Sequence, residues 1–197
     1  MYGIYDSVSG KVIATFAAPM TVKSNRPVSV SDTLSLKRFS SSSQAQRWEI
    51  ETALVPANSG AQNLFVDLVS KGYTTATKVL MPQNRGSYLA RTATGGALAS
   101  GAAGGSTITF SVSGMIPKGS FVNFGTDSKI YMLLGDANTN GSVGIYPELR
   151  TNLSNATMHY AEDVVGSFYY DTDVVRGMVY SDGILMDMGT IKLVEAL

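Results

Sequence analysis

The segment 136–141, with the sequence DANTNG, comes closest to a chemical motif. Oxygen-bearing side chains at its first, third and fifth positions, followed by a glycine, match the beginning of a calcium-binding loop. The acid that would close such a loop is missing, because the twelfth position is Pro147 and Glu148 comes one residue late. Strand patterns flank the segment, so we interpret Asn140-Gly141 as the tip of a β-hairpin and predict no metal site.

Two further features bear on catalysis and phosphate binding. The glycine-rich run 96–101 is followed by Ala102 and Ala103, where a phosphate-binding loop requires Lys and then Ser or Thr. His159 is the one histidine in the sequence, and no nucleophile or acid accompanies it in a recognisable catalytic arrangement. The chain has no cysteine, which excludes a cysteine nucleophile, a thiolate zinc site and disulfides. We predict that the protein is not an enzyme, has no catalytic residues and binds no cofactor.

Aromatic residues in the second half of the chain would stack on sugars or bases if they were exposed, and would fill the core of a small barrel if they were buried. They are Tyr88, Phe121, Phe124, Tyr131 and Tyr146. The chain carries 15 Lys plus Arg against 15 Asp plus Glu, so it has no net charge with which to hold phosphates. We therefore predict no specific nucleic-acid binding, and an oligosaccharide remains the alternative ligand class.

The surface is expected to be poor in charge. Charged residues make up 15% of the chain, against about 25% in an average globular domain, and the mean hydropathy is +0.08. This composition favours self-association. The sequence shows no signal peptide and no stretch of about 18 apolar residues, so we expect no membrane contact and synthesis in a cytoplasm.

The elements expected from the sequence are mainly β-strands, because most segments alternate with a period of two and are rich in Val, Ile, Thr, Tyr and Phe. One packed helix is predicted over 58–71, ending at Gly72, with one apolar face. That face comprises Ala61, Leu64, Phe65 and Leu68. The run 94–105 (TGGALASGAAGG) has side chains too small to fill a core, and we predict a flexible loop there.

The domain organisation follows from the last third of the chain. Short strand patterns after residue 105 have the spacing of a small barrel. A closing hairpin with Asp182-Gly183 at its turn is long and apolar enough to rejoin the first sheet. We predict a discontinuous β domain, 1–84 and 174–197, and an inserted small β-barrel, 85–173.

This order of parts resembles the distal tail proteins of long-tailed bacteriophages, most closely the siphophage type with a single inserted domain. The segments that carry the resemblance in the outer domain are KRFS (37–40), QRWEIE (46–51) and KVLMPQ (78–83). In the insert, a glycine-led strand, a Lys-x-Tyr strand and a Pro-x-Leu-Arg corner are similar to phage tail sequences. They are PKGSFVNFG (117–125), KIY (129–131) and IYPELR (145–150).

The resemblance implies a split-barrel-like domain with an inserted oligonucleotide/oligosaccharide-binding fold (OB-fold). It implies a structural virion protein, assembled in the host cytoplasm, of which six copies form a ring that joins the tail tube protein to a hub or fibre protein at the tail tip. The genome would pass through this ring unbound. A contractile-tail baseplate hub subunit and a carbohydrate-binding OB-like module are the alternatives.

The ring contacts are expected on the strand edges of 28–39, 46–54 and 174–195, because apolar edges in a ring are covered by neighbours. The candidate interface residues are Val28, Val30, Leu34, Leu36, Trp48, Ile50, Val175, Met178, Ile184 and Met186.

Overall fold

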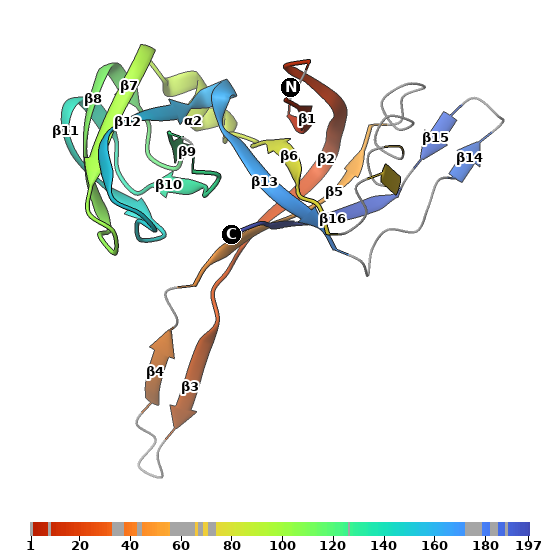
Figure 1. Ribbon diagram of the computed structural model, residues 1–197, viewed down its shortest axis with the longest axis horizontal. Helices are drawn as coiled ribbons and strands as arrows, with labels where there is room; N and C mark the ends of the chain where they lie inside the picture. The colour runs from red at the N-terminus through yellow and green to blue at the C-terminus, as the bar shows by residue number, and fades with distance from the viewer. Residues whose placement is uncertain are drawn as a thin grey trace.

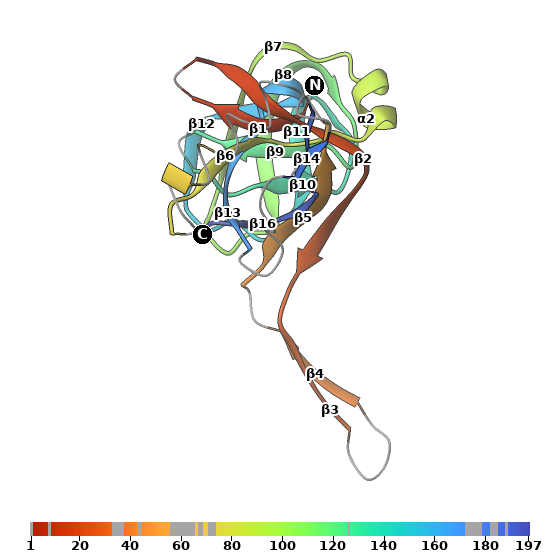
Figure 2. The same ribbon diagram turned by 90° about the vertical axis from the view of Figure 1, so that its right-hand side faces the viewer.

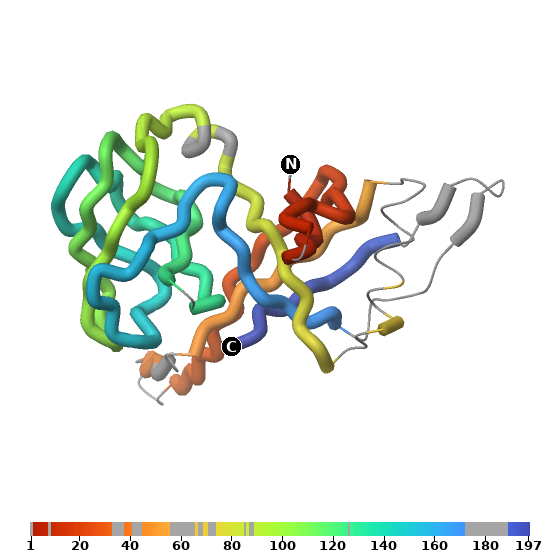
Figure 3. Tube along the Cα trace, turned by 45° about the horizontal axis from the view of Figure 1, so that its top comes forward, coloured from red at the N-terminus to blue at the C-terminus, as the bar shows by residue number. Residues whose placement is uncertain are grey.

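The protein is mainly β, as predicted from its alternating sequence (Figure 1). The structure is a computed structural model that describes residues 2–7, 9–32, 38–42, 45–55, 66, 69–70, 74–125, 127–171, 179–181, 185–187 and 189–197. In these residues the strands form two closed barrels and two small two-stranded sheets. The two barrels lie side by side (Figure 3).

The first barrel combines strands from both ends of the chain. Its strands, in spatial order, are β1 (Gly3–Asp6), β2 (Lys11–Asn25), β5 (Arg47–Leu54), β16 (Thr190–Glu195), β13 (Val165–Tyr170) and β6 (Thr77–Leu80). The neighbouring strands are antiparallel. Apolar residues at alternate positions point inward, as the period-two pattern requires, and Ile4, Ile50, Phe168 and Leu193 are fully buried.

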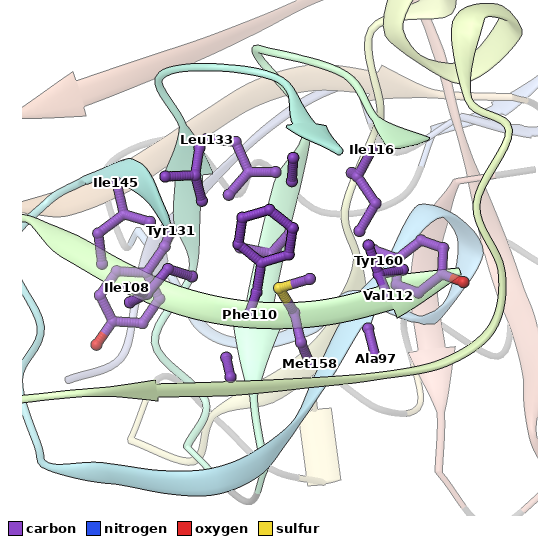
Figure 4. Close-up of a cluster of buried hydrophobic side chains, with 14 of the residues drawn as sticks. Ala97, Ile108, Phe110, Val112, Ile116, Tyr131, Leu133, Ile145, Met158 and Tyr160 are labelled. Carbon is purple, nitrogen blue, oxygen red and sulfur yellow. The ribbon is translucent and has the colours of Figure 1, made fainter. Parts of the chain in front are cut away.

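The second barrel is built from one continuous stretch of chain. Its strands, in spatial order, are β10 (Tyr131–Leu133), β11 (Ala137–Tyr146), β8 (Thr107–Ile116), β7 (Thr94–Gly101), β12 (Leu153–Tyr160) and β9 (Phe121–Phe124). Phe110, Met158 and Tyr131 fill its interior together with smaller aliphatic side chains (Figure 4).

Short helices accompany the two crossings between the barrels. The chain leaves the first barrel after β6 and passes through α2 (Arg85–Ala90), at whose N-cap Asn84 Oδ1 accepts a hydrogen bond of 2.8 Å from Gly86 N. It returns through a single 3-10 turn, η1 (Ala161–Asp163), into β13. The six-residue helix α2 was not expected from the sequence, because it lacks an apolar stripe and acidic residues in its first turn.

The predicted helix 58–71 lies almost entirely outside the described residues. Within it, Val66, Val69 and Ser70 are helical, and the side chains of Val66 and Val69 are exposed. The residues expected on its apolar face are not among those described, so its packing stays a prediction.

Two sequence interpretations in the second barrel are wrong. The run 94–105 is not a flexible loop, because 94–101 forms β7 and its Ala97 and Ala99 are buried in the barrel core. Small inward side chains fit here because Phe110 and Met158 occupy the interior, and narrow barrels combine small and large residues. Asn140-Gly141 is not a hairpin tip, since it lies within β11, paired with β8. The pairing with β8 instead shifts register between Asn138 and Asn140, where Thr139 has a positive φ of 51° and faces residues 112–114 of β8.

The expected boundary of the insert is also corrected. Residues 165–170 were expected in the inserted barrel, but they form β13, which pairs with β6 and β16 of the first barrel. Alternation identifies a strand without saying which sheet it joins, and this produced the error. In the closing segment, β14 (Val179–Ser181) and β15 (Leu185–Asp187) pair as a separate ribbon, and β16 lies between β5 and β13. The expected turn at Asp182-Gly183 lies outside the described residues.

Candidate functional site

A long β-hairpin projects from the first barrel, away from both barrels (Figures 1 and 2). We call residues 25–32, 38–42 and 45–47 the arm. Beyond the end of β2, the arm continues as β3 (Val28–Asp32) and β4 (Arg38–Ser42), paired from Val28 opposite Ser42 to Asp32 opposite Arg38. Alternating Val and Ser in β3 and the Ser-rich β4 give the period-two pattern that favours an extended pair.

Polar cross-strand pairs hold the arm and its root together. At the root, Asn25 Nδ2 donates to Glu49 Oε1 at 2.7 Å. Further out, Arg38 Nε donates to Asp32 Oδ1 at 3.1 Å. The Arg38–Asp32 pair is solvent-exposed, and an exposed ion pair stabilises a ribbon by no more than about 1 kcal/mol. A two-stranded ribbon is only marginally stable alone in water, so the arm is a natural element for binding to another sheet or surface.

The arm carries exposed apolar side chains on both faces. Val28 and Val30 are 51% and 52% exposed and share one face, whereas Phe39 is 54% exposed and lies on the other face, opposite Ser31. Every described residue of β3 is exposed. Apolar residues gathered on a projecting ribbon with open edges are typical of interaction surfaces.

The predicted interface residues fall into three groups. Val28 and Val30 lie exposed on the arm, as an interface requires. Trp48 and Ile50 do not, because they are 4% and 0% exposed in the core of the first barrel, so their assignment to the interface is wrong. Alternation separated the two faces of β5, but its apolar face points into the barrel instead of toward a neighbour. Met186 is part of β15, opposite Tyr180. Leu34, Leu36, Val175, Met178 and Ile184 lie outside the described residues.

A groove lies at the base of the arm, where the two barrels meet. It consists of two adjoining cavities of about 360 Å³ and 340 Å³ that share Ala45, Gln46 and Leu197. We call it the arm-base groove. One end is lined by Asn25, Pro27 and Arg47 of the arm, and the other by Gly104, Lys129 and the corner Pro147, Glu148, Leu149 and Arg150 of the second barrel.

The floor of the groove contains a buried ion pair between the barrels. Lys129 Nζ donates to Glu195 Oε2 at 2.5 Å, to Gln46 Oε1 at 2.7 Å and to the Gln46 carbonyl at 3.1 Å. Glu195 also accepts hydrogen bonds from Trp48 N and Ile130 N, at 3.0 Å and 2.8 Å. Burial raises the pKa of the Glu195 carboxyl and lowers the pKa of the Lys129 ammonium, and the opposite charge of the partner counteracts each shift. Because these contacts satisfy both groups, the pair joins the barrels rather than serving a ligand.

Aromatic packing surrounds this joint. Trp48 Nε1 donates to the Ile130 carbonyl at 2.8 Å, and the Trp48 ring meets Phe121 and Tyr146 edge-on at centroid distances of 5.1 Å and 6.0 Å. Ile130 is buried in the core cluster of the first barrel although it lies in the chain of the second. The barrels are therefore packed together, not merely tethered.

The aromatic residues expected to fill or coat the second barrel are mostly interior. Phe124 and Tyr131 lie in its core, while Phe121 and Tyr146 are half-buried in the joint between the barrels. Burial raises the pKa of Tyr131 to about 12. The side chain of Tyr88 lies outside the described set. These aromatic side chains act as packing groups, which removes the basis for a stacking site made from them.

The calcium-like segment has a structural role instead. Asp136 Oδ1 accepts a hydrogen bond of 2.7 Å from Lys118 N and so fixes the loop before β9. Within the part of the chain that the structure describes, no group of three or more His, Asp or Glu side chains is placed to hold a metal ion. Among the same residues, no helix is long and apolar enough to cross a bilayer.

A second, shallower groove lies on the outer face of the second barrel. It measures about 200 Å³ and is lined by uncharged residues of β7, β8 and β12. Ser100 Oγ accepts from Asn155 N at 2.9 Å, and Thr109 Oγ1 donates to the Ser100 carbonyl at 3.2 Å. Leu98 adds an exposed apolar side chain.

Comparison with known proteins gives no family assignment, since no protein-family model and no curated protein matches the sequence. The functional argument therefore depends on the geometry of the arm and its surroundings.

Proposed function

We propose that this protein is a structural component of a bacteriophage virion that forms a hexameric ring at the distal end of the tail. The ring connects the tail tube protein to a hub or fibre protein at the tail tip, and it is assembled in the host cytoplasm. The observation that carries this proposal is the arm, a projecting ribbon with exposed Val28, Val30 and Phe39. An element of this kind is stable and soluble when another protein surface covers it.

The arrangement of open edges supports a ring. Closed barrels leave no free strand edges, so in the described residues the ribbons with open edges are β3–β4 and β14–β15. These ribbons have different sequences and lie on different sides of the first barrel (Figure 1). A contact in which the arm of one copy meets a different surface of the next copy is heterologous, and heterologous contacts generate rings when the rotation closes. A chain with 15% charged residues is suited to such extensive covered surfaces.

The fold supports the same proposal at a finer level. We assign the first barrel, formed by chain segments before and after the second, as the split-barrel-like ring domain. We assign the second barrel, residues 94–160, as the inserted OB-like domain. In this assignment the first barrel carries the ring contacts, and the genome passes through the ring without specific contacts, in line with the zero net charge.

The experiment is a measurement of mass and shape. The purified protein is expected to form a ring, visible by electron microscopy, with a mass about six times that of the chain by light scattering. The double variant Ser29→Lys/Val30→Lys should give a folded monomer with an unchanged circular dichroism spectrum, because it charges the exposed arm only. The control Ala102→Lys lies in the exposed turn after β7 and should still form rings. A stable monomer at all concentrations would contradict the proposal.

Two alternative functions are compatible with the same structure. A carbohydrate-binding OB-like module is favoured by the uncharged, hydroxyl-lined groove at Ser100 and Thr109. Binding of neutral glycans by a monomer, lost in Thr109→Lys, would select this alternative. A contractile-tail baseplate hub subunit has the same expected ring, and electron micrographs of assembled particles distinguish it from the siphophage type.

A further inference from the structure

We infer that the arm-base groove is the receptor for the arm of a second copy of this chain. The inference rests on the proposed ring and names the surface that each arm occupies. The root of the arm lines its own groove, but β3 and β4 project away from the barrels, so these two strands reach this groove only on another molecule (Figures 1 and 2). Each copy then gives one arm and receives one, which is a heterologous contact that repeats around a ring.

One face of the arm has the chemistry that the groove requires. In β3, alternate residues share a face, so Val28 and Val30 lie together with Asp32, whose cross-strand partner is Arg38. This face is apolar near the root and carries a guanidinium group toward the tip. The Arg38 side chain is 70% exposed, and among the described residues only its Nε donates a hydrogen bond, to Asp32, so the guanidinium group has further donors to offer.

The groove matches this face of the arm, since it has an apolar lining and an acidic residue at its second-barrel end. Ala45, Leu149, Pro147 and Leu197 give it a largely apolar lining. At the second-barrel end, Glu148 lines the cavity, and its Oε2 is buried without a hydrogen-bond partner among the described residues. A buried carboxylate oxygen in this state is unfavourable, and rotation of the carboxylate toward the cavity would let an incoming N–H group satisfy it.

The other charges around the groove already have partners within the chain. Lys129 pairs with Glu195, Arg150 Nη2 lies 3.4 Å from Asp127, and Arg47 Nε lies 3.6 Å from Glu49. Glu148 is therefore the acidic residue of the groove lining that a positively charged group of another molecule could pair with. Arg38 of a second copy supplies it, while Val28 and Val30 cover the apolar lining.

The length of the arm is sufficient for this contact. From the pair Asn25–Arg47 at its root to the pair Asp32–Arg38 near its tip, the arm covers about 23 Å at roughly 3.3 Å per residue. Neighbouring strands lie about 4.8 Å apart, so an arm of this length can cross about five strands of an adjacent barrel.

Cysteine cross-linking tests the contact directly, because the natural chain contains no cysteine. Val30→Cys places a thiol on the arm face, and Ala45→Cys places one in the groove. The double variant is expected to form disulfide-linked chains of up to six copies on oxidation, whereas each single variant is expected to form none. The matched control combines Val30→Cys with Leu98→Cys, which is exposed on the outer face of the second barrel, and should not cross-link.

A charge exchange tests the Arg38–Glu148 pair. Arg38→Glu and Glu148→Lys should each weaken association by about 30-fold or more, and the two together should restore most of it. If Glu148→Lys alters the circular dichroism spectrum, Glu148→Gln takes its place as a single variant and should still weaken association.

The outcomes separate this inference from the proposed function. If the wild-type protein forms rings that are insensitive to Arg38 and Glu148, and the double-cysteine variant does not cross-link, the groove is not the arm receptor although the ring remains. If Val30→Cys cross-links alone, the arms pair with each other, and the inference is wrong. If the groove variants form normal rings but no longer join tails, the groove belongs to another tail protein, and the inference is again wrong. If the wild-type protein is a monomer throughout, both proposals fail.

Discussion

Replacing Lys129 with Met removes one partner of the buried ion pair between the barrels. Its side chain is 3% exposed and that of Glu195 is 0% exposed, so the remaining carboxylate has no access to water. It keeps two backbone donors, Trp48 N and Ile130 N, but loses the charge that balances it. Breaking a buried pair in this way destabilises proteins by about 3–5 kcal/mol, and we expect Lys129→Met to lower the free energy of unfolding by that amount.

The stability deficit of Lys129→Met, meaning its loss of free energy of unfolding relative to wild type, should grow as pH rises. Burial already raises the pKa of Glu195, and loss of the lysine removes the group that opposes this rise. A carboxyl whose pKa is raised on folding binds its proton more tightly in the folded state. It therefore destabilises the fold progressively as pH rises from the unfolded pKa, about 4.3, to the folded pKa. The deficit of the variant should be smaller at pH 5 than at pH 8.

Urea denaturation of wild-type and variant proteins at both pH values measures this prediction. The double variant Lys129→Met/Glu195→Gln removes the unpaired charge and keeps one oxygen acceptor, for either Trp48 N or Ile130 N. It should recover part of the loss and abolish its pH dependence, which makes it the matched control. A deficit of Lys129→Met below about 1 kcal/mol, or one equal at pH 5 and pH 8, would refute the role assigned to the pair.

Three further predictions concern single positions. Tyr131 has a pKa raised to about 12, so the folded state should lose stability between pH 10 and pH 12, by up to about 1.4 kcal/mol per pH unit. Tyr131→Phe should remove this part of the alkaline loss in urea titrations at pH 9 and pH 11. Gly3→Ala should destabilise the first barrel by several kcal/mol, roughly the scale of an overpacked core, because the new Cβ would lie 1.9 Å from the Ala14 carbonyl oxygen; a melting temperature within one or two degrees of wild type would contradict this. Calcium should not raise the melting temperature, and Asp136→Ala should lower it slightly through loss of the bond to Lys118 N, a result that calcium-dependent stabilisation would overturn.

The sequence predicts the class of fold because strand formation follows local alternation. The segment 47–54 shows this well, since its buried and exposed residues alternate as its sequence does. Alternation does not specify the partner of a face. Trp48 and Ile50 were expected at a ring contact for this reason, and they lie instead inside a barrel that closes through β16, far away in the chain.

Amino-acid composition predicted local structure least well where the packing of neighbouring strands decides which residues fit. Ala97 and Ala99 belong to a run that is typical of flexible linkers, but the bulk of Phe110 on the neighbouring strand makes their small size suitable for a barrel interior. The candidate site also depends on tertiary structure. Val28 and Val30 were identified from the sequence, but their exposure on an arm was not. Glu148 gains its significance from the burial of its Oε2 atom, which no local pattern encodes.

The position of β16 has a consequence for the order of events during synthesis. Residues 94–160 can form the second barrel as soon as they leave the ribosome, because all of its strands lie within that stretch. The first barrel must wait for residues 190–195, which cover the edge of β5 and supply Glu195 to the joint. Until then the root of the arm rests on an open sheet, and nascent or truncated chains have no rigid base from which to present it. In the proposed ring, a chain that lacks residues 190–195 would therefore fail to present its arm to a neighbour.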